Sequence, residues 1–311
     1  MRVVYIASKG RSGSTLLSHC LGQLDGFFSA GELWHLWDWG LVEGRRCGCG
    51  RPVPDCEVWS RVVADEALAG LDPRQVVGWQ RAVLNWRAVP RVLAERPGRS
   101  PAWPPLSALA RVRGDLYRAI GRVTGARVVV DSSKWPWDPV LLGLVPGVRA
   151  AGLHLVRDPR GVAHSWRRRK SWQDHDERPS EMPRFDAGYT AASWLGRNAV
   201  VEVVRRRGVV PWMRLRYEDF VEAPRGTLRT VADLVGESAA PPAVTGERTV
   251  MCGPTHTVAG NAARFQRGPV TLRADDEWER ALPRRDAVVA GVVGAPLLRR
   301  YGYPLRARAT R

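Results

Sequence analysis

The chain has 311 residues, of which 44% are hydrophobic and 25% are charged, so it can bury the core of one large domain or of two smaller ones. No apolar run reaches the roughly 20 residues that a membrane-spanning helix needs, which argues against an integral membrane protein. The net charge of +17 is compatible with an anionic ligand. Because only Lys9, Lys134 and Lys170 are lysines, the arginine excess indicates biased coding more than selection for charge, and it does not require a nucleic-acid partner.

The first elements of the chain are a strand, a polar loop and a helix. The apolar residues 2–8 predict a buried strand at the start of the sequence, so we expect no signal peptide and a soluble, cytoplasmic protein. The loop Lys9-Gly-Arg-Ser-Gly-Ser-Thr15 leads into a helix expected over 14–24. Such a loop is typical of a phosphate cradle, because backbone N–H groups and the positive helix end face the anion. A P-loop nucleotidase would place Gly-Lys before the Ser/Thr, whereas here the basic residue lies upstream, at Arg11.

The rest of the chain alternates between strand and helix patterns. Further strands are expected at 27–33, 127–131, 150–156 and 212–217, and helices at 61–95 (broken near Asp72-Pro73), 106–123, 159–172, 188–207, 224–236 and 274–300. From residue 245 to these last helices the chain looks irregular. The alternation indicates an α/β fold with a parallel central sheet flanked by helices. We expect a single domain over 1–311, with a possible insertion or lid at about 40–125.

Three of the five cysteines, Cys47, Cys49 and Cys56, lie in one loop rich in glycine and proline. Their spacing differs from the paired Cys-x-x-Cys of common zinc sites, and His35 is the only nearby candidate for a fourth ligand. A disulfide is disfavoured in a cytoplasmic protein. The pattern favours a compact loop with reduced thiols, and metal binding is the second interpretation.

Polar residues follow three of the predicted strands. The loop with Arg11 follows the first strand, Asp131-Ser-Ser-Lys134 ends the strand at 127–131, and Arg157-Asp-Pro-Arg160 follows the strand at 150–156. Ligands of open α/β sheets bind at the carboxyl ends of the strands. Three basic, hydroxyl-rich loops at one edge therefore indicate a ligand with more than one phosphate.

Together these segments resemble the sulfotransferases that use 3′-phosphoadenosine 5′-phosphosulfate (PAPS). Arg11-Ser-Gly-Ser-Thr-Leu16 is similar to the phosphosulfate loop of that family. The segment from Leu155 to Ser165 resembles the one in which an arginine, and a serine eight residues later, hold the 3′-phosphate; these are Arg157 and Ser165 here. Arg216-Tyr-Glu-Asp219 is similar to the late strand of the family. The resemblance implies the P-loop-like nucleotide-binding sulfotransferase fold.

The motif spacing is closest to the branch that includes tyrosylprotein sulfotransferases and many bacterial sulfotransferases. The other cytosolic branch has a histidine after the middle strand, where this chain has Ser132-Ser-Lys134. The branch resembled here places a glutamate after the second strand, and Glu32 fits that position. The late phosphate loop of the family is only partly present; its best equivalents are Asn261, Arg264, Arg267 and Gly268.

The resemblance implies roles for the matched residues. The candidate catalytic side chains are Arg11 and Lys134, as cations around the transferring group, and Glu32, as a general base whose pKa a desolvated site would raise. The candidate donor-binding residues are Ser12, Gly13, Ser14 and Thr15 at the 5′-phosphate, and Arg157 and Ser165 at the 3′-phosphate. Tyr217 would pack beside the nucleotide or position a loop. The adenine would stack on Trp135 or Trp59.

The implied reaction moves a sulfuryl group from PAPS to a hydroxyl acceptor and releases adenosine 3′,5′-bisphosphate (PAP), without a metal. The 14 tryptophans favour an aromatic or glycosylated small molecule as the acceptor, while a peptide tyrosine or the hydroxyl of a sugar or lipid stays open. Its pocket is expected from residues 33–125 and 172–190. No nucleic-acid or membrane partner is expected, and the oligomeric state is not readable.

Several alternatives remain open at this level. A P-loop kinase or ATPase could use Asp131 to bind magnesium, and the net charge alone would also suit a non-enzymatic polyanion binder. His35 or His256 could replace Glu32 as the base, while His154 is expected to pack within its strand. The basic run at 167–170 is expected to be mostly a solvated helix face.

Overall fold

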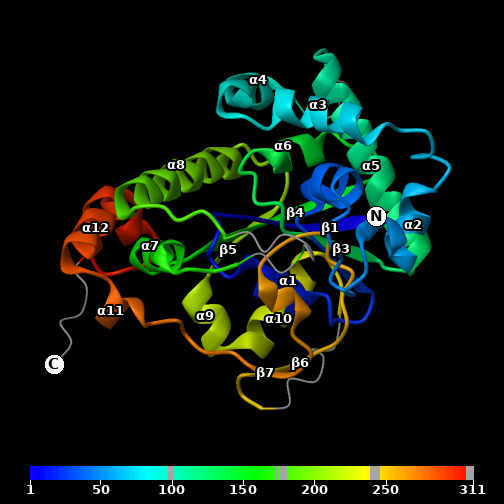
Figure 1. Cartoon of the computed structure of the whole chain (residues 1–311). Coiled ribbons are helices and arrows are strands. Elements are labelled where there is room, and N and C mark those ends of the chain that lie inside the picture. Colours follow the sequence, from blue (N-terminus) through cyan, green and yellow to red (C-terminus); the bar gives the residue numbers. More distant parts are fainter. Residues whose placement is uncertain (97–100, 172–173, 175–180, 239–245, 306–311) are drawn as a thin grey trace.

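A five-stranded parallel sheet forms the centre of the molecule (Figure 1). The computed structural model describes residues 1–96, 101–171, 174, 181–238 and 246–305. The strands are β1 (Arg2–Ser8), β2 (Phe27–Gly31), β3 (Val128–Asp131), β4 (Arg149–Val156) and β5 (Trp212–Arg216). They lie in the order β2-β3-β1-β4-β5, and every neighbouring pair is parallel. The predicted α/β class with a parallel central sheet is confirmed.

Helices cover both faces of this sheet. Their bounds are α1 (Ser14–Leu21), α2 (Glu57–Val63), α3 (Pro73–Val83), α4 (Val89–Ala94), α5 (Pro104–Thr124), α6 (Asp138–Gly143), α7 (Pro159–Arg167), α8 (Ala187–Arg206), α9 (Tyr217–Glu222), α10 (Pro224–Leu234), α11 (Trp278–Ala281) and α12 (Arg284–Leu298). A π-helix spans Trp37–Val42 after β2. Within the described ranges, no helix combines the length and the apolar character needed to cross a membrane.

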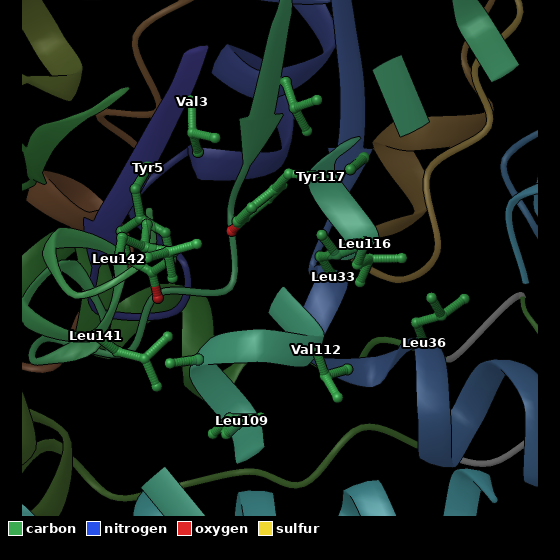
Figure 2. Close-up of a cluster of buried hydrophobic side chains, with 14 of the residues drawn as sticks. Val3, Tyr5, Leu33, Leu36, Leu109, Val112, Leu116, Tyr117, Leu141 and Leu142 are labelled. Carbon is green, nitrogen blue, oxygen red and sulfur yellow. The ribbon is translucent and has the colours of Figure 1, made fainter. Parts of the chain in front are cut away.

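Alternate residues of β1 are buried against different helices. Val3 and Tyr5 belong to the larger core cluster with residues of α5 and α6 (Figure 2), whereas Val4 and Ile6 belong to a second cluster with residues of α1 and α10. Side chains of a strand alternate between the two faces, and both faces are covered here. The continuous apolar run that predicted this strand is therefore the direct consequence of its burial on both sides.

Helix α5, the last helix of the segment at 40–125, packs against the sheet. It begins with Pro104 and Pro105, which suit the first helical positions because no N–H partner is needed there. It ends at Thr124, and Gly125 caps it with a left-handed φ of 71°. Leu116 and Tyr117 of this helix lie in the same core cluster as Val3 of β1 (Figure 2). The segment that we considered as an insertion or lid thus contributes a helix to the main core.

The expectation of an irregular chain from residue 245 to the last helices is wrong in one respect. Strands β6 (Thr249–Cys252) and β7 (Gly268–Thr271) form an antiparallel pair that is separate from the main sheet, and β6 contacts helix α1. Each strand has only four residues and is partly exposed, so the apolar alternation that would predict it is short.

The strand order creates a switch point between β1 and β4. After β1 the chain turns to β2 on one side of the sheet, and after β4 it continues to β5 on the other side. Connections that diverge in this way leave a crevice at the carboxyl ends of the two strands. The polar segments that follow the strands all reach this edge.

Candidate active site

A cavity of about 480 Å³ lies at the carboxyl edge of the sheet. The segments that follow all five strands line it, namely the loop after β1, Glu32 after β2, Lys134 after β3, Arg157 after β4 and Tyr217 after β5. This volume lies within the range of about 300–1,000 Å³ that is usual for small-ligand sites. The three predicted strand-end loops, and two further ones, therefore meet in one place.

Gly13 shapes the loop between β1 and α1. Its φ of 88° is left-handed, and a Cβ at this position would collide with the ring of Tyr217. The Gly13 carbonyl accepts the N–H of Leu17 at 3.0 Å, so helix α1 begins at Ser14, beside the cavity. The first N–H groups of a helix have no partner within it, and they carry the positive end of the helix dipole.

Arg11 also adopts a left-handed backbone conformation, with a φ of 72°. Its carbonyl accepts a hydrogen bond from Nη1 of Arg157 at 3.1 Å, and its guanidinium lies 5.1 Å from the ring centroid of Trp166. Its buried Nε has no hydrogen-bond partner among the described residues. Burial and the neighbouring Arg168 lower the pKa of Arg11, against the opposing effect of Glu32.

Arg157 supports the loop between β1 and α1 through several contacts. Besides the Arg11 carbonyl, its guanidinium donates to the backbone carbonyl of Asp275 at 2.9 Å, pairs with the Asp275 carboxylate at 3.1 Å and lies 4.7 Å from the Tyr217 ring centroid. Ser165, eight residues later on α7, lines the same cavity. Arg157 and Ser165, which were predicted to bind a 3′-phosphate, therefore lie at the same cavity as the loop that was predicted to bind a 5′-phosphate.

Glu32 and Lys134 form an ion pair across the cavity wall. Lys134 has a φ of 69°, so it and Arg11 are the two residues other than glycine with a positive φ in the described part of the chain. The turns that carry the pair are linked, because the Trp34 N–H donates to Oγ of Ser133 at 3.1 Å. The predicted base and one of the two predicted clamp cations are therefore in direct contact, a pairing that the sequence did not predict.

The pKa of Glu32 differs from our expectation. Burial raises it, but Lys134 and His35 act in the opposite direction, and the resulting pKa lies below the ordinary glutamate value of 4.5. We expected desolvation to dominate and to raise this pKa. The ion pair with Lys134 reverses the sign because a nearby cation stabilises the carboxylate.

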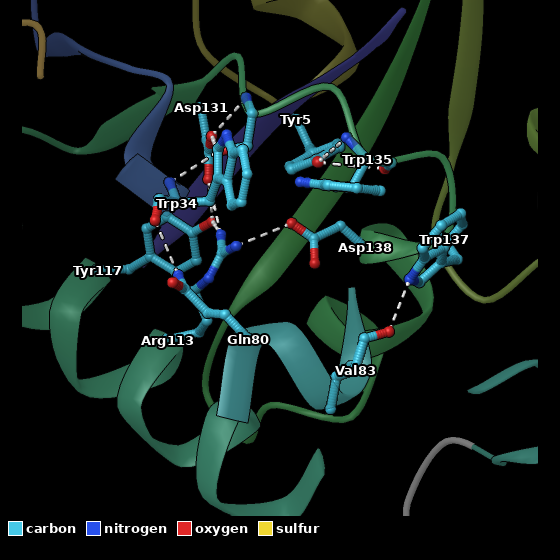
Figure 3. Close-up of polar contacts among 11 residues, drawn as sticks. Tyr5, Trp34, Gln80, Val83, Arg113, Tyr117, Asp131, Trp135, Trp137 and Asp138 are labelled. Carbon is cyan, nitrogen blue, oxygen red and sulfur yellow. Dashed lines mark hydrogen bonds and ion pairs between the residues drawn. The ribbon is translucent and has the colours of Figure 1, made fainter. Parts of the chain in front are cut away.

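A buried polar network supports the turn at Lys134 (Figure 3). Arg113 of α5 donates to Asp131 and to Asp138, each at 3.0 Å, and the Tyr117 hydroxyl donates to Asp131 at 2.7 Å. The Trp135 N–H donates to the Tyr5 hydroxyl at 2.8 Å. Asp131 is fully buried and does not line the cavity. Its carboxylate is committed to the network, so it is not positioned to bind magnesium as the kinase alternative requires.

Cations outnumber carboxylates around the cavity. All three lysines of the chain line it, together with Arg11, Arg157 and Arg197, whereas the lining carboxylates are Glu32 and Asp275. Burial, and then the charge of Arg197, lower the pKa of Lys9 to about 8. Burial, followed by Arg11 and Arg168, lowers the pKa of Lys170 to about 8 as well. This excess of positive charge is costly without an anion and favourable with one.

Aromatic side chains form two other parts of the lining. Trp34 and Trp135 meet edge to face with ring centroids 5.4 Å apart. Phe185 lies 5.0 Å from Trp166 and 4.8 Å from Tyr189, again between ring centroids. The cavity thus combines a cationic region with flat apolar walls.

Two solved structures share this architecture. The chain superposes on a "Sulfotransferase Domain from the Synechococcus PCC 7002 Olefin Synthase" with a TM-score of 0.54, over 98% of this chain and 96% of that chain at 22% identity. It superposes on a "Sulfotransferase Domain from the Curacin Biosynthetic Pathway" with a TM-score of 0.51, over 97% and 98% of the chains at 18% identity. The chain has the sulfotransferase fold. No family model and no curated protein matches the sequence.

Within this sulfotransferase fold, most of the predicted site residues come together. Those that line the cavity are Arg11, Gly13, Ser14, Thr15, Glu32, Lys134, Arg157, Ser165, Tyr217 and Asn261. Asn261 is held there because its N–H donates to Oγ1 of Thr15 at 3.2 Å. Their roles toward a ligand stay predictions.

Four predicted donor-binding residues do not line the cavity. Ser12 belongs to the loop, but it is buried. Arg264 is buried too, because its guanidinium donates to the backbone carbonyls of Thr257 and Arg46. Arg267 is exposed, and Gly268 begins β7. Of the four residues that partly match the late phosphate loop of the family, Asn261 alone lines the cavity.

The alternative bases and one adenine-stacking candidate also lie elsewhere. His35 stacks on Trp39, and His256 contacts Cys56; neither lines the cavity. Trp59 is fully buried, so it cannot stack on a ligand in this site, whereas Trp135 lines it. His154 is buried within β4 as expected.

Sequence reasoning missed Lys9, Lys170 and Arg197 as site residues. Lys170 belongs to the basic run that we expected to be a solvated helix face, and α7 ends before it, at Arg167. The rarity of lysine in an arginine-rich chain could have singled out Lys9 and Lys170, and Lys9 also opens the loop that follows β1. The expected acceptor segments contribute Trp34, Met182, Phe185 and Tyr189, and residues 172–173 and 175–180 of that prediction lie outside the described residues.

Proposed function

We propose that this protein transfers a sulfuryl group from PAPS to a hydroxyl of a small aromatic acceptor. The observation that carries the proposal is the meeting of two separate anion-binding candidates in one cavity, the loop around Gly13 and the pair Arg157 and Ser165. A nucleotide with phosphates at both its 5′ and 3′ ends needs two such positions. The excess of lining cations and the unpartnered Nε of Arg11 support an anionic ligand of this kind.

In the proposed reaction the protein itself forms no covalent bond to the substrate. The S–O bond to the 5′-phosphate breaks, a new S–O bond forms to the acceptor oxygen, the acceptor proton moves to a base, and PAP leaves as an anion. The protein must align the acceptor, accept this proton and stabilise the negative charge on the leaving oxygen. Arg11 and Lys134 are suited to the last task because their left-handed turns direct both residues to the cavity.

Glu32 is the base in this proposal. Its low pKa keeps the carboxylate ionised, and therefore able to accept a proton, in the ligand-free protein. Engagement of Lys134 by a bound anion would weaken the ion pair and leave burial as the dominant effect. The pKa of Glu32 would then rise toward the range in which a carboxylate is an effective base.

The aromatic walls and the two solved domains favour a biosynthetic small molecule as the acceptor. Trp34 and Trp135 lie on the Glu32 side of the cavity, and an aromatic ring packed against them would gain from stacking geometry. The two solved domains come from an olefin synthase and from the curacin biosynthetic pathway. A peptide tyrosine presents the same phenol, and the assay below distinguishes the two acceptors.

The first test compares PAP with adenosine 5′-monophosphate, which lacks the 3′-phosphate. A ligand at about 100 times its dissociation constant adds roughly 2.7 kcal/mol of stability, so PAP is expected to raise the melting temperature well above the effect of the monophosphate. Arg157→Met should weaken PAP binding by about 10- to 100-fold, the equivalent of about 1.5–3 kcal/mol for a charge-assisted hydrogen bond. Arg229→Met, at an exposed position outside the cavity, is the matched control.

The second test follows labelled sulfate from PAPS into phenols and into tyrosine peptides, with a chelator present. Transfer to phenols supports the proposal, and transfer to peptides alone would replace the small-molecule acceptor by a polypeptide. A melting temperature that responds to ATP with magnesium but not to PAP would overturn the proposal in favour of a phosphotransferase.

A further inference from the structure

A second cluster of reactive side chains lies outside the cavity. Cys47, Cys49, Cys56 and His256 each direct one ligand-type atom into a common space, and these four atoms lie within 4.8 Å of one another. Cys47 and Cys56 are fully buried, and none of the three cysteines forms a disulfide. None of the four residues lines the cavity at the carboxyl edge of the sheet. The cluster therefore needs an explanation of its own.

The geometry points to a structural zinc site, and we propose that these three cysteines and His256 bind one zinc ion. A tetrahedral site has zinc–sulfur bonds of about 2.3 Å and a zinc–nitrogen bond of about 2.0–2.1 Å, so its ligand atoms lie roughly 3.5–3.8 Å from each other. The Cys56 Sγ and the His256 Nδ1 are 3.2 Å apart, close to that separation. Three thiolates and one imidazole are a donor set that selects zinc over magnesium or calcium.

The surroundings of His256 orient its ring for this role. Its Nδ1 faces Cys56, while its Nε2 lies 3.8 Å from a carboxylate oxygen of Glu57. Metal-binding histidines commonly direct their second nitrogen to a carboxylate or carbonyl in this way. The backbone beside the ring is fixed as well, because the buried Trp59 indole donates to the His256 carbonyl at 2.6 Å.

Backbone hydrogen bonds shape the loop that carries the cysteines. The Cys47 N–H donates to the Arg51 carbonyl at 2.8 Å, and the Gly50 N–H donates to the Cys47 carbonyl at 2.9 Å. Gly48 approaches the histidine segment so closely that a Cβ would collide with Thr255, and its N–H donates to the Thr257 carbonyl at 2.9 Å. A backbone hydrogen bond therefore joins the cysteine loop to the segment that contains His256.

The four ligands would complete the coordination of the ion and leave no position for a substrate. Such closed sites contribute stability rather than catalysis. Binding would release the protons of the three thiols to solvent and would transfer no electron. The proposal thus differs from our preferred sequence interpretation of a loop with free reduced thiols, and His256 takes the place that we considered for His35.

The site would also support the cavity indirectly. The Val258 N–H, two residues after His256, donates to the Ala30 carbonyl at 3.0 Å, just before Glu32. Asn261 follows in the same segment and bonds to Thr15. Zinc would fix this segment to the cysteine loop some 200 residues earlier in the chain. We expect its loss to lower stability first and activity second.

Metal analysis of the purified full-length protein tests the proposal. We expect about one zinc per chain after dialysis, and replacement by Co²⁺ should give the strong visible absorption of tetrahedral, thiolate-bound cobalt. A chain that retains no zinc and gives no such absorption with added Co²⁺ would overturn the assignment. These readouts do not depend on sulfuryl transfer, so they stand or fall independently of the proposed function.

Variants locate the ion. Cys49→Ser and His256→Ala should lose zinc during dialysis against a chelator, whereas His256→Cys should keep it because a fourth thiolate can replace the imidazole. Cys252→Ala, a buried cysteine outside the cluster, is the matched control and should keep its zinc. If Cys49→Ser does not fold, retention in His256→Cys together with loss in His256→Ala decides. Zinc undiminished in His256→Ala would place the ion elsewhere and overturn the proposal.

Discussion

At the scale of single residues, the backbone conformations of Arg11 and Lys134 carry the most information. A left-handed conformation costs a long side chain of order 1–3 kcal/mol, and it persists only where the surroundings enforce it. The surroundings are identifiable here, because Arg157 binds the Arg11 carbonyl and Tyr5 binds the N–H of Trp135, next to Lys134. Arg11 and Lys134 are therefore held beside the cavity in strained backbone conformations, and the hydrogen bonds of the neighbouring residues offset the free-energy cost of this strain.

Paired substitutions separate this strain from the charge of Arg11. Both Arg11→Ala and Arg11→Gly should lose sulfuryl transfer by orders of magnitude, because the cation is gone. Arg11→Gly should be the more stable of the two by about 1 kcal/mol, since glycine adopts a left-handed φ without the steric cost. Urea unfolding measures this difference. A glycine variant that is no more stable than the alanine variant would mean that the turn is unstrained.

Glu32→Gln tests the base. Turnover should fall by about 10²- to 10⁴-fold, the usual contribution of a general base, while PAP affinity should be kept or improved because Lys134 loses its competing carboxylate. Since the pKa of Glu32 lies below 4.5 in the ligand-free protein, kcat/KM for the proposed transfer by the unsubstituted protein should not decline between pH 7 and about 5. Glu43→Gln, outside the cavity, is the control. Near-normal turnover of Glu32→Gln would contradict the assignment.

At the scale of elements, α5 links stability to the site. Arg113 on this helix is buried between Asp131 at the end of β3 and Asp138 at the start of α6. The two carboxylates flank the turn that carries Lys134. A charge pair of this kind gives the turn one defined position, and it is costly to interrupt because the remaining carboxylates would stay buried and unpaired.

Arg113→Met should therefore destabilise the protein by about 3–5 kcal/mol, which is the usual cost of removing one partner from a buried ion pair. Arg111→Met, an exposed position on the same helix, should change stability by no more than about 0.5 kcal/mol. Chemical unfolding of both variants measures the difference. Equal losses would show that the network adds nothing beyond helix propensity.

The elements also show what the sequence could and could not predict. The bounds of β1 agree with the predicted 2–8, because the apolar run is too short for a typical helix and a loop with two glycines follows it directly. The π-helix at Trp37–Val42 and the β6–β7 pair were not predicted, since both depend on packing against distant segments. The position of His256 beside Cys56 could not be read either, because 200 residues separate them and no local pattern joins them.

The site was predictable to the extent that its residues sit at strand ends. The rule that strand ends meet at one edge was enough to place the Arg11 loop, Lys134 and Arg157 together, and the family resemblance added Glu32. Lys170 and Arg197 escaped this rule, although both line the cavity. Arg197 lies within α8, and only the packing of that helix directs its side chain to the cavity.

At the scale of the whole molecule, the buried lysines couple ligand binding to pH. In the folded protein Lys9 and Lys170 lose their protons near pH 8, whereas in the unfolded chain lysines keep theirs up to about 10.5. Between these values the unfolded chain binds more protons, so the free energy of unfolding contributed by these groups rises with pH. In the same window the cavity loses positive charge, so its affinity for anions falls.

The stabilisation by PAP should therefore decrease as pH rises from about 8 to about 10, while the ligand-free protein gains stability from the same two groups. Melting curves with and without PAP across this range measure both effects. Lys170→Arg should keep more of the PAP effect at high pH, because arginine stays charged. A PAP effect that does not change with pH would mean that neither lysine contacts the anion.

The position of all site loops at the carboxyl ends of the strands has a consequence for engineering. In the described part of the chain, the opposite edge of the sheet carries short turns, among them those at Gly125 and Gly208, where a Cβ added to either glycine would meet no other atom within 4 Å. Tags, fluorophores or whole partner domains inserted in these turns would leave the cavity untouched. The loops at the carboxyl edge of the sheet can thus be changed to bind new substrates, and the turns at the opposite edge can be changed independently to carry tags or partner domains.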